Sequence, residues 1–108
     1  MWNYNFFVYI ITNRNKNVLY IGVTNDLQRR LTEHYDNRGN SATFAGKYHC
    51  YYLLHYERFS NIDHAISREK ELKKWSREKK ISLIKETNLE LRFLNDDVKS
   101  DSLINTII

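Results

Sequence analysis

The fold of this chain is decided by residues 6–23, which read FFVYIITNRNKNVLYIGV. Residues 6–12 are rich in aromatic and β-branched side chains, a composition typical of a strand, and residues 18–23 repeat this character. Between them, residues 13–17 are polar and rich in asparagine, which tolerates the unusual backbone angles of turns. The sequence therefore predicts a β-hairpin made of Phe6–Thr12 and Val18–Val23.

The register of this hairpin decides whether two tyrosines meet. A turn centred between Arg14 and Asn15 places Tyr9 directly opposite Tyr20. Because side chains alternate between the faces of a strand, both phenol rings would then lie on one face, close enough to share a site. A slip of one residue would separate them.

A helix is predicted directly after the hairpin, with Thr24 or Asn25 as its N-cap. Successive helical residues are turned by about 100°. One face of this helix therefore carries Leu27, Arg30, Leu31 and His34. Arg29 falls nearly opposite, so we expect Arg30 to point toward the sheet and Arg29 toward solvent.

The second half of the chain contains one more predicted strand and two more predicted helices. The aromatic-rich segment Cys50–Phe59 predicts the strand. We expect Asn61 to cap a long helix that runs to about Arg77. A further helix is expected from about Glu78 to Glu86.

Two segments are predicted to lack regular structure. The loop Asp36–Tyr48 holds Gly39 and Gly46, and we expect it to be mobile and to contribute to binding. The segment 96–108 is predicted to be a weakly ordered tail. This leaves one domain over residues 1–95, and a hydrophobic content of 42% is enough for a single core.

A carboxylate interrupts the apolar stripe of the long helix. The inward residues of this stripe are Ile62, Ala65, Ile66 and Leu72, and Glu69 falls among them. Because an isolated buried carboxylate is costly, it must be neutralised, paired or bound to a cation. One interpretation is an ion pair with Lys73, one turn away. The other is a ligand for a hard divalent ion such as Mg²⁺.

Together, these polar residues indicate phosphodiester hydrolysis. This reaction needs a group that activates water and positive charge on the phosphate in its transition state. Tyr9 or Tyr20 could relay a proton, Arg30 could clamp phosphate oxygens, and His34 could assist proton transfer or orient a tyrosine. Each residue also has a structural interpretation: packed tyrosines, a paired arginine, and a histidine that caps helix carbonyls.

A net charge of +4 and a pI of about 9.2 favour a polyanionic partner. The segment 68–80 is strongly basic and is either a solvated helix face or a contact surface for phosphates. The residues predicted to contact nucleic acid are Arg29, Lys47, Lys73, Lys74 and Arg77.

The remaining composition bears on the cellular compartment and excludes other chemistry. Cys50 is the only cysteine, which excludes an internal disulfide and a Cys/His zinc site and fits a reducing compartment. No apolar stretch is long enough to span a membrane, and no secretory signal is visible at the start. A cytoplasmic protein without membrane contact is expected.

The combined motifs resemble the GIY-YIG endonuclease superfamily, most closely its short stand-alone bacterial members. The matching segments are Phe7-Val8-Tyr9, Tyr20-Ile21-Gly22, the helix with Arg30 and His34, the helix with Glu69, and the segment that ends at Asn88. Two positions depart from the pattern. Phe7 replaces the first-motif glycine, and Leu89 follows Asn88 where proline is frequent.

The resemblance implies a small α/β (α+β) domain, with a three-stranded antiparallel sheet flanked by helices. It also implies an endonuclease that cuts DNA and depends on one divalent ion, Mg²⁺ or Mn²⁺. Tyr9, Tyr20, Arg30, His34, Glu69 and Asn88 would be its catalytic residues, with Glu69 as the metal ligand. Larger relatives add DNA-binding domains. For this chain the resemblance therefore implies a target specificity that is low, directed by DNA structure, or supplied by a protein partner.

Two other functions remain open from the sequence. The chain could be a nucleic-acid-binding module that retains the nuclease fold without its chemistry. It could also be an accessory subunit that contacts another protein.

Overall fold

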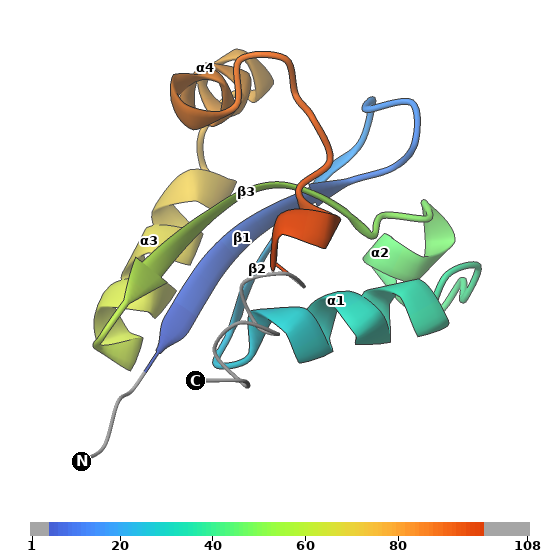
Figure 1. Cartoon of the computed structure of the whole chain (residues 1–108), viewed down its shortest axis with the longest axis horizontal. Helices are drawn as coiled ribbons and strands as arrows, with labels where there is room; N and C mark the ends of the chain where they lie inside the picture. The colour runs from blue at the N-terminus through green and yellow to red at the C-terminus, as the bar shows by residue number, and fades with distance from the viewer. Residues whose placement is uncertain (1–4, 99–108) are drawn as a thin grey trace.

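The computed structural model describes residues 5–98 and shows a three-stranded antiparallel sheet between helices (Figure 1). The central strand is β1, Phe6–Thr12. It pairs with β2, Leu19–Thr24, and with β3, Tyr52–Phe59. The predicted fold class is confirmed. The predicted bounds of β1 are correct, whereas β2 begins one residue later than predicted and β3 begins at Tyr52 instead of Cys50.

The predicted hairpin register is wrong, although its consequence for the tyrosines holds. Tyr9 lies opposite Gly22, and Tyr20 lies opposite Ile11. The turn is therefore shifted toward Lys16, which adopts a left-handed backbone with φ of 61°. Because pairing moved by an even number of positions, Tyr9 and Tyr20 still share a face, as diagonal neighbours instead of opposite residues.

The central strand contributes side chains to two hydrophobic cores, one on each face of the sheet. Tyr9 and Ile11 pack beneath helix α1, Leu27–Asp36, whereas Val8 and Ile10 pack on the opposite face. The second core is closed by α3, Ile62–Lys73, and α4, Arg77–Thr87. Each fully buried aliphatic side chain stabilises the fold by roughly 1.5–3 kcal/mol. These cores fix the two helical layers relative to the sheet.

The predicted N-cap of α1 is wrong by one or two residues. Asp26 is the cap, and its carboxylate accepts a hydrogen bond from the Arg29 backbone N–H at 3.0 Å. Thr24 instead supports the turn before the helix, where its hydroxyl accepts from the Asp26 N–H at 3.1 Å. The predicted faces of the helix are unaffected, because Leu27, Leu31 and His34 are buried.

The segment 36–48 is not the irregular loop that the sequence predicts. It contains a short helix, α2, Phe44–Lys47, which is capped by the side chain of Thr43. Gly39 adopts a left-handed φ of 85°, a conformation that favours glycine. Its N–H donates to the Gly46 carbonyl at 2.9 Å, which closes the segment on itself. Internal hydrogen bonds therefore give this connection a defined shape.

The long predicted helix ends early. Asn61 caps α3 as predicted, but the helix stops at Lys73, and Ser76 caps α4 before the predicted start at Glu78. Trp75 lies in the break and packs against the second core. Nζ of Lys79 lies 4.2 Å from the centroid of the Trp75 ring. The apolar stripe is also shorter than predicted, because Ile62 is exposed.

The folded part continues past the predicted boundary at residue 95. Residues 95–98 form a helical turn, and Val98 packs in the core beneath α1. The Asn95 side chain donates to the Tyr51 carbonyl at 2.9 Å and accepts from the Leu53 N–H at 2.8 Å. The rest of the predicted tail, residues 99–108, lies outside the described residues. Within residues 5–98, no helix has the length and apolarity required to cross a membrane.

Candidate functional site

A hydrogen bond between Tyr9 and His34 forms the centre of the candidate site. The Tyr9 hydroxyl lies 2.8 Å from Nε2 of His34, which links the central strand to α1. Tyr9 is 1% exposed and His34 is 5% exposed. Each side chain therefore provides the hydrogen-bond partner of the other at a position that is almost inaccessible to water.

Tyr20 joins this pair from the edge strand. Its ring centroid lies 5.5 Å from that of His34 and 6.4 Å from that of Tyr9. On its other side, Tyr20 stacks on Phe44 of α2, with a centroid distance of 6.3 Å and an interplanar angle of 25°. The two strand tyrosines and the histidine therefore form one cluster, as the sequence predicts.

The two adjacent arginines of α1 differ in direction. The Arg29 side chain is 59% exposed, whereas that of Arg30 is 38% exposed and lies near Tyr9. Arg30 Nη1 donates to a Glu33 carboxylate oxygen at 3.1 Å. Arg30 therefore brings its positive charge to the tyrosine–histidine cluster, with Glu33 as its resting counter-ion.

A cleft of about 420 Å³ opens in front of the cluster. Its walls include Tyr20, Arg30, Glu33 and His34 from one side and residues 43–45 from the other. Tyr9 does not line this cleft. It lies behind His34, so Tyr20, Arg30 and His34 are the predicted site residues that a bound molecule would meet.

Burial keeps the central pair neutral. Desolvation raises the pKa of the Tyr9 hydroxyl to about 12, although the nearby Arg30 charge acts in the opposite direction. Desolvation, reinforced by the charge of Arg30, lowers the pKa of His34 to about 4. At neutral pH, His34 is therefore an uncharged imidazole.

Gly22 makes room for the Tyr9 side chain. A Cβ at this position would lie 2.4 Å from the Tyr9 hydroxyl oxygen and 2.5 Å from Cζ. Real Cβ atoms do not approach other atoms so closely, and the tyrosine ring cannot yield without leaving His34. The glycine of the Tyr20-Ile21-Gly22 motif is therefore required by packing at the site.

Glu69 comes from the opposite helical layer. Its side chain is 16% exposed, and its carboxylate pairs with Lys73 Nζ at 3.3 Å. The neighbouring Arg68 turns toward β3, where it donates to Glu57 at 2.8 Å. Since adjacent helical residues differ by about 100° in direction, Glu69 lies on the flank of α3 that faces away from β3. Glu69 does not line the cleft of Tyr20, Arg30 and His34.

Glu69 is the residue that the sequence predicts to hold a metal ion. Among the described residues, no group of three or more His, Cys, Asp or Glu side chains could form a metal centre. A half-buried single carboxylate fits Mg²⁺ or Mn²⁺, because Mg²⁺ keeps several waters and takes its other ligands from substrate phosphates. The Lys73 ammonium would have to move away from the carboxylate.

The side chain of Asn88 is held in hydrogen bonds to backbone groups. It caps α4 and is buried, and its Nδ2 donates to the carbonyls of Leu54 at 3.0 Å and Arg92 at 2.8 Å. Its Oδ1 accepts from the Arg92 N–H at 2.9 Å. Both ends of the amide are engaged, so the surroundings of Asn88 do not support the predicted catalytic role.

The five basic residues predicted to contact nucleic acid come from different parts of the surface. Arg29 lies on α1, Lys47 at the end of α2, and Lys73 and Lys74 at the end of α3. Arg77 donates to the carbonyls of Lys16 at 2.8 Å and Asn17 at 3.1 Å. This arginine therefore fastens α4 to the hairpin turn.

Among the cleft residues that sequence reasoning missed, Glu33 and Phe44 contact predicted site residues. Glu33 could have been found, because it follows Arg30 by three positions and such residues are neighbours on a helix. Phe44 carried no such signal, since α2 was expected to be irregular loop. Its contact with Tyr20 depends on the fold of the whole 36–48 segment.

Several known proteins are similar to this chain. Residues 5–82 match the family of GIY-YIG catalytic domains. A UPF0213 protein of Haloquadratum walsbyi is 39% identical over 80 residues, which span 74% of this chain and 86% of the relative. For a UPF0213 protein of Staphylococcus aureus the identity is 35%, with coverage of 74% and 94%. The solution NMR structure of a UPF0213 protein from Bacillus halodurans shares 30% identity and covers 78% of this chain and 86% of that one, with a TM-score of 0.49.

Proposed function

Because the chain belongs to the GIY-YIG family of catalytic domains, we propose that it hydrolyses phosphodiester bonds in DNA with a divalent metal ion. The family is a nuclease superfamily, which implies a nucleic acid as the substrate, and its nucleases generally use a divalent metal. The observation that carries the proposal is that Tyr20, Arg30 and His34 line one cleft, with Tyr9 hydrogen-bonded to His34 behind it.

In this proposal, Arg30 binds the phosphate. A guanidinium presents a rigid fork of donors that matches two phosphate oxygens, and it opposes the negative charge that grows in the transition state. The substrate must displace Glu33, which occupies Nη1 of Arg30 in the free protein. Because this ion pair is largely exposed, the exchange costs little.

His34 is the group that takes up the proton of the attacking water in this proposal, and the Tyr20 hydroxyl relays it by accepting the water proton while releasing its own. The water oxygen forms the new bond to phosphorus while the bond to the leaving oxygen breaks, and the proton passes from the water to the protein. A bound phosphate brings negative charge that offsets Arg30 and raises the proton affinity of His34. Tyr9 is a positioning residue, because its hydroxyl holds Nε2 of His34. For Nδ1 to take up a proton, Nε2 must carry the ring hydrogen and donate it to the Tyr9 oxygen.

The substrate would lie across the edge strand β2. This strand is at the end of the sheet order β2-β1-β3, so one of its edges is unpaired within the described sheet. Tyr20 packs on the α1 side of that edge, and the proposal requires the Glu69 carboxylate of α3 to reach a phosphate bound at the same edge. Glu69 would hold Mg²⁺ or Mn²⁺, and the bound ion would supply Lewis-acid stabilisation of the phosphate and leaving group.

One observation favours a second candidate function. The Glu69 carboxylate forms an ion pair with Lys73. This pair is the alternative to metal binding that the sequence left open for Glu69. If that ion pair persists with DNA bound, the chain would bind nucleic acid without cutting it. Its binding would then weaken with salt and survive loss of the Glu69 carboxylate.

A cleavage assay with Mg²⁺ titration distinguishes the two functions. Duplex, single-stranded, flap and branched DNA would be offered to the wild type, Arg30→Ala and Glu69→Ala. The nuclease proposal predicts product from the wild type and none from either variant. Equal cleavage by all three proteins would point to a contaminant or another site. Binding without product under any metal would support the second function.

A further inference from the structure

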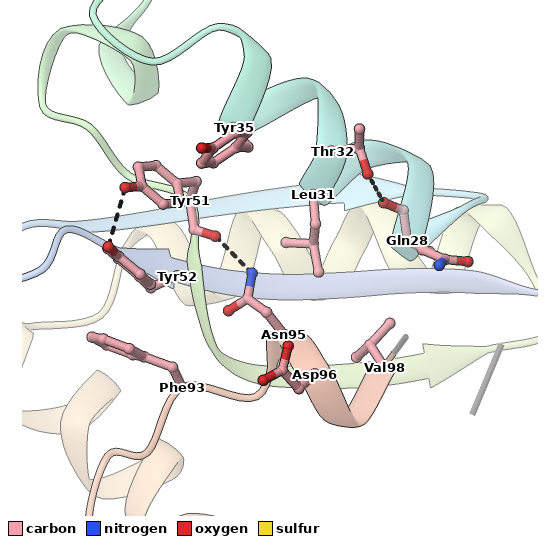
Figure 2. A pocket seen from close by; sticks show the side chains of 10 residues that line it. All are labelled: Gln28, Leu31, Thr32, Tyr35, Tyr51, Tyr52, Phe93, Asn95, Asp96 and Val98. Carbon is pink, nitrogen blue, oxygen red and sulfur yellow. Dashed lines mark hydrogen bonds between the residues drawn. The ribbon is translucent and has the colours of Figure 1, made fainter. Parts of the chain in front are cut away.

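A second cavity lies on the other side of α1 from the candidate catalytic cleft. Its volume is about 450 Å³, and four aromatic residues contribute to its wall: Tyr35, Tyr51, Tyr52 and Phe93. Figure 2 shows these rings on one side of the cavity, with Leu31 and Thr32 of α1 and with Asn95, Asp96 and Val98 around the rest. We call this cavity the aromatic groove. It shares no lining residue with the candidate catalytic cleft.

The four rings of the groove form a continuous row. Tyr35 meets Tyr51 edge to face at 5.1 Å, Tyr51 lies 4.3 Å from Tyr52, and Tyr52 stacks on Phe93 at 4.2 Å with an interplanar angle of 19°. These rings come from α1, the start of β3 and the segment after α4. Three separate parts of the chain therefore meet to expose one aromatic surface.

Both ends of this row carry a cation. The guanidinium carbon of Arg38 lies 3.8 Å from the Tyr35 ring centroid, and Nζ of Lys16 lies 5.2 Å from that of Phe93. On the opposite wall, Gln28 and Asp96 offer an amide and a carboxylate. Aromatic faces flanked by positive charges, with hydrogen-bonding groups across from them, suit bases linked by phosphates.

The groove is held in shape before any ligand arrives. The Tyr51 and Tyr52 hydroxyls are hydrogen-bonded at 3.1 Å. The Asn95 side chain fastens the backbone at Tyr51 and Leu53. Because Tyr52 lies between Tyr51 and Phe93, its faces are covered, and the exposed ring Tyr35 at the rim is the one on which a base would stack. A wall that is formed before binding lowers the ordering entropy that binding costs.

We propose that the aromatic groove binds unpaired bases of a single-stranded nucleic acid. The two cavities flank one helix, whose diameter with side chains is about 10 Å, so one strand can occupy both. This inference rests on the proposed function in one respect: a strand cut in the catalytic cleft would place neighbouring unpaired bases in the groove. Substrates with single-stranded segments would then be preferred to continuous duplex.

The test measures binding alone, in EDTA, by fluorescence anisotropy of a short labelled oligothymidylate. Tyr35→Ala removes a ring that is 47% exposed, so the variant should fold, which circular dichroism would verify. Because stacking contributes about 1–3 kcal/mol per base, affinity should fall about tenfold. Tyr35→Phe should restore it. Tyr56→Ala is the matched control, since Tyr56 is a half-exposed ring on β3 outside both cavities.

An abasic strand of the same length distinguishes binding through the bases from binding through the phosphates. It should bind weakly, and equally to the wild type and Tyr35→Ala. Equal binding of the two strands, or equal affinity of the wild type and Tyr35→Ala, would overturn the proposal. If a protein segment were the occupant, the oligothymidylate would not bind, which also overturns it. Since no cleavage is measured, these outcomes are independent of whether Glu69 supports catalysis.

Discussion

The Tyr9 hydroxyl lies 2.8 Å from Nε2 of His34, in a place where both side chains are almost completely buried. This contact fixes the imidazole at the back of the cleft lined by Tyr20 and Arg30. It also divides the two motif tyrosines by role. In the proposed function, Tyr20 would face a bound molecule, whereas Tyr9 would position His34.

This division predicts different kinetic effects for the two hydroxyls. Tyr20→Phe should lower kcat by about a hundredfold with little change in KM, as expected for a group that acts in proton transfer. Tyr9→Phe should lower kcat less, because the imidazole remains but is less well oriented. Steady-state kinetics on one DNA substrate would measure both, with Tyr56→Phe as control. Equal kinetics for Tyr20→Phe and the wild type would contradict the role of Tyr20.

Gly22→Ala should damage the site without touching any polar group. The new Cβ would lie 2.4 Å from the Tyr9 hydroxyl oxygen, so the ring must shift and the contact with His34 must lengthen. Overpacking of this kind costs about 1–3 kcal/mol of unfolding free energy. Urea denaturation would measure that loss. Adding Tyr9→Leu, which removes the clashing ring, should recover stability but not activity. An alanine variant as stable and active as the wild type would refute this packing requirement.

The stability of the protein should fall as the pH drops from about 6.5 toward 4. In this window the unfolded chain protonates His34, whereas the folded protein keeps it neutral because its pKa is lowered to about 4. The unfolded state therefore binds more protons, and unfolding becomes easier by about 2–3 kcal/mol in total.

His34→Gln should remove most of this dependence on pH, whereas His64→Gln, at an exposed residue of α3, should leave it in place. Urea titrations at a series of pH values would measure the slope. An identical slope in the wild type and His34→Gln would show that another group is responsible.

Asn88→Ala should reduce stability by about 2–3 kcal/mol, because two carbonyls and one N–H would lose their partner in or near the core. Leu89→Ala changes the exposed neighbour and should have little effect. Thermal unfolding of both variants would test the comparison. If Asn88→Ala unfolded like the wild type, its structural role would be wrong and the catalytic interpretation would regain weight.

The sequence predicted the sheet and the cluster on α1 because both follow from short-range periodicity. Alternation along β1 and a helical turn of about 100° per residue were enough to place Tyr9, Arg30 and His34. The register was wrong because it depends on the conformation of the turn near Lys16, which asparagine-rich composition does not specify. Tyr9 and Tyr20 were still predicted on the same face of the sheet, because the pairing moved by an even number of residues.

Other features could not be predicted because they depend on contacts between distant segments. Asn88 is fixed by backbone groups of β3 and the segment after α4. The aromatic groove gathers Tyr35, Tyr52 and Phe93 from three parts of the chain. The helix break near Trp75 reflects the packing of its ring against the second core, which outweighs the helical propensity of the lysines around it.

The central claim is that Glu69 supports metal-dependent cleavage at the cleft of Arg30, and one comparison tests it most directly. Glu69→Gln and Glu71→Gln each remove one carboxylate from the same helix, but Glu71 is exposed and pairs with Arg68. Cleavage of branched DNA would be followed across a Mg²⁺ titration for both variants and the wild type. We predict that Glu69→Gln makes no product at any Mg²⁺ concentration, whereas Glu71→Gln cuts like the wild type. Cleavage by Glu69→Gln with the same dependence on Mg²⁺ as the wild type would contradict the account.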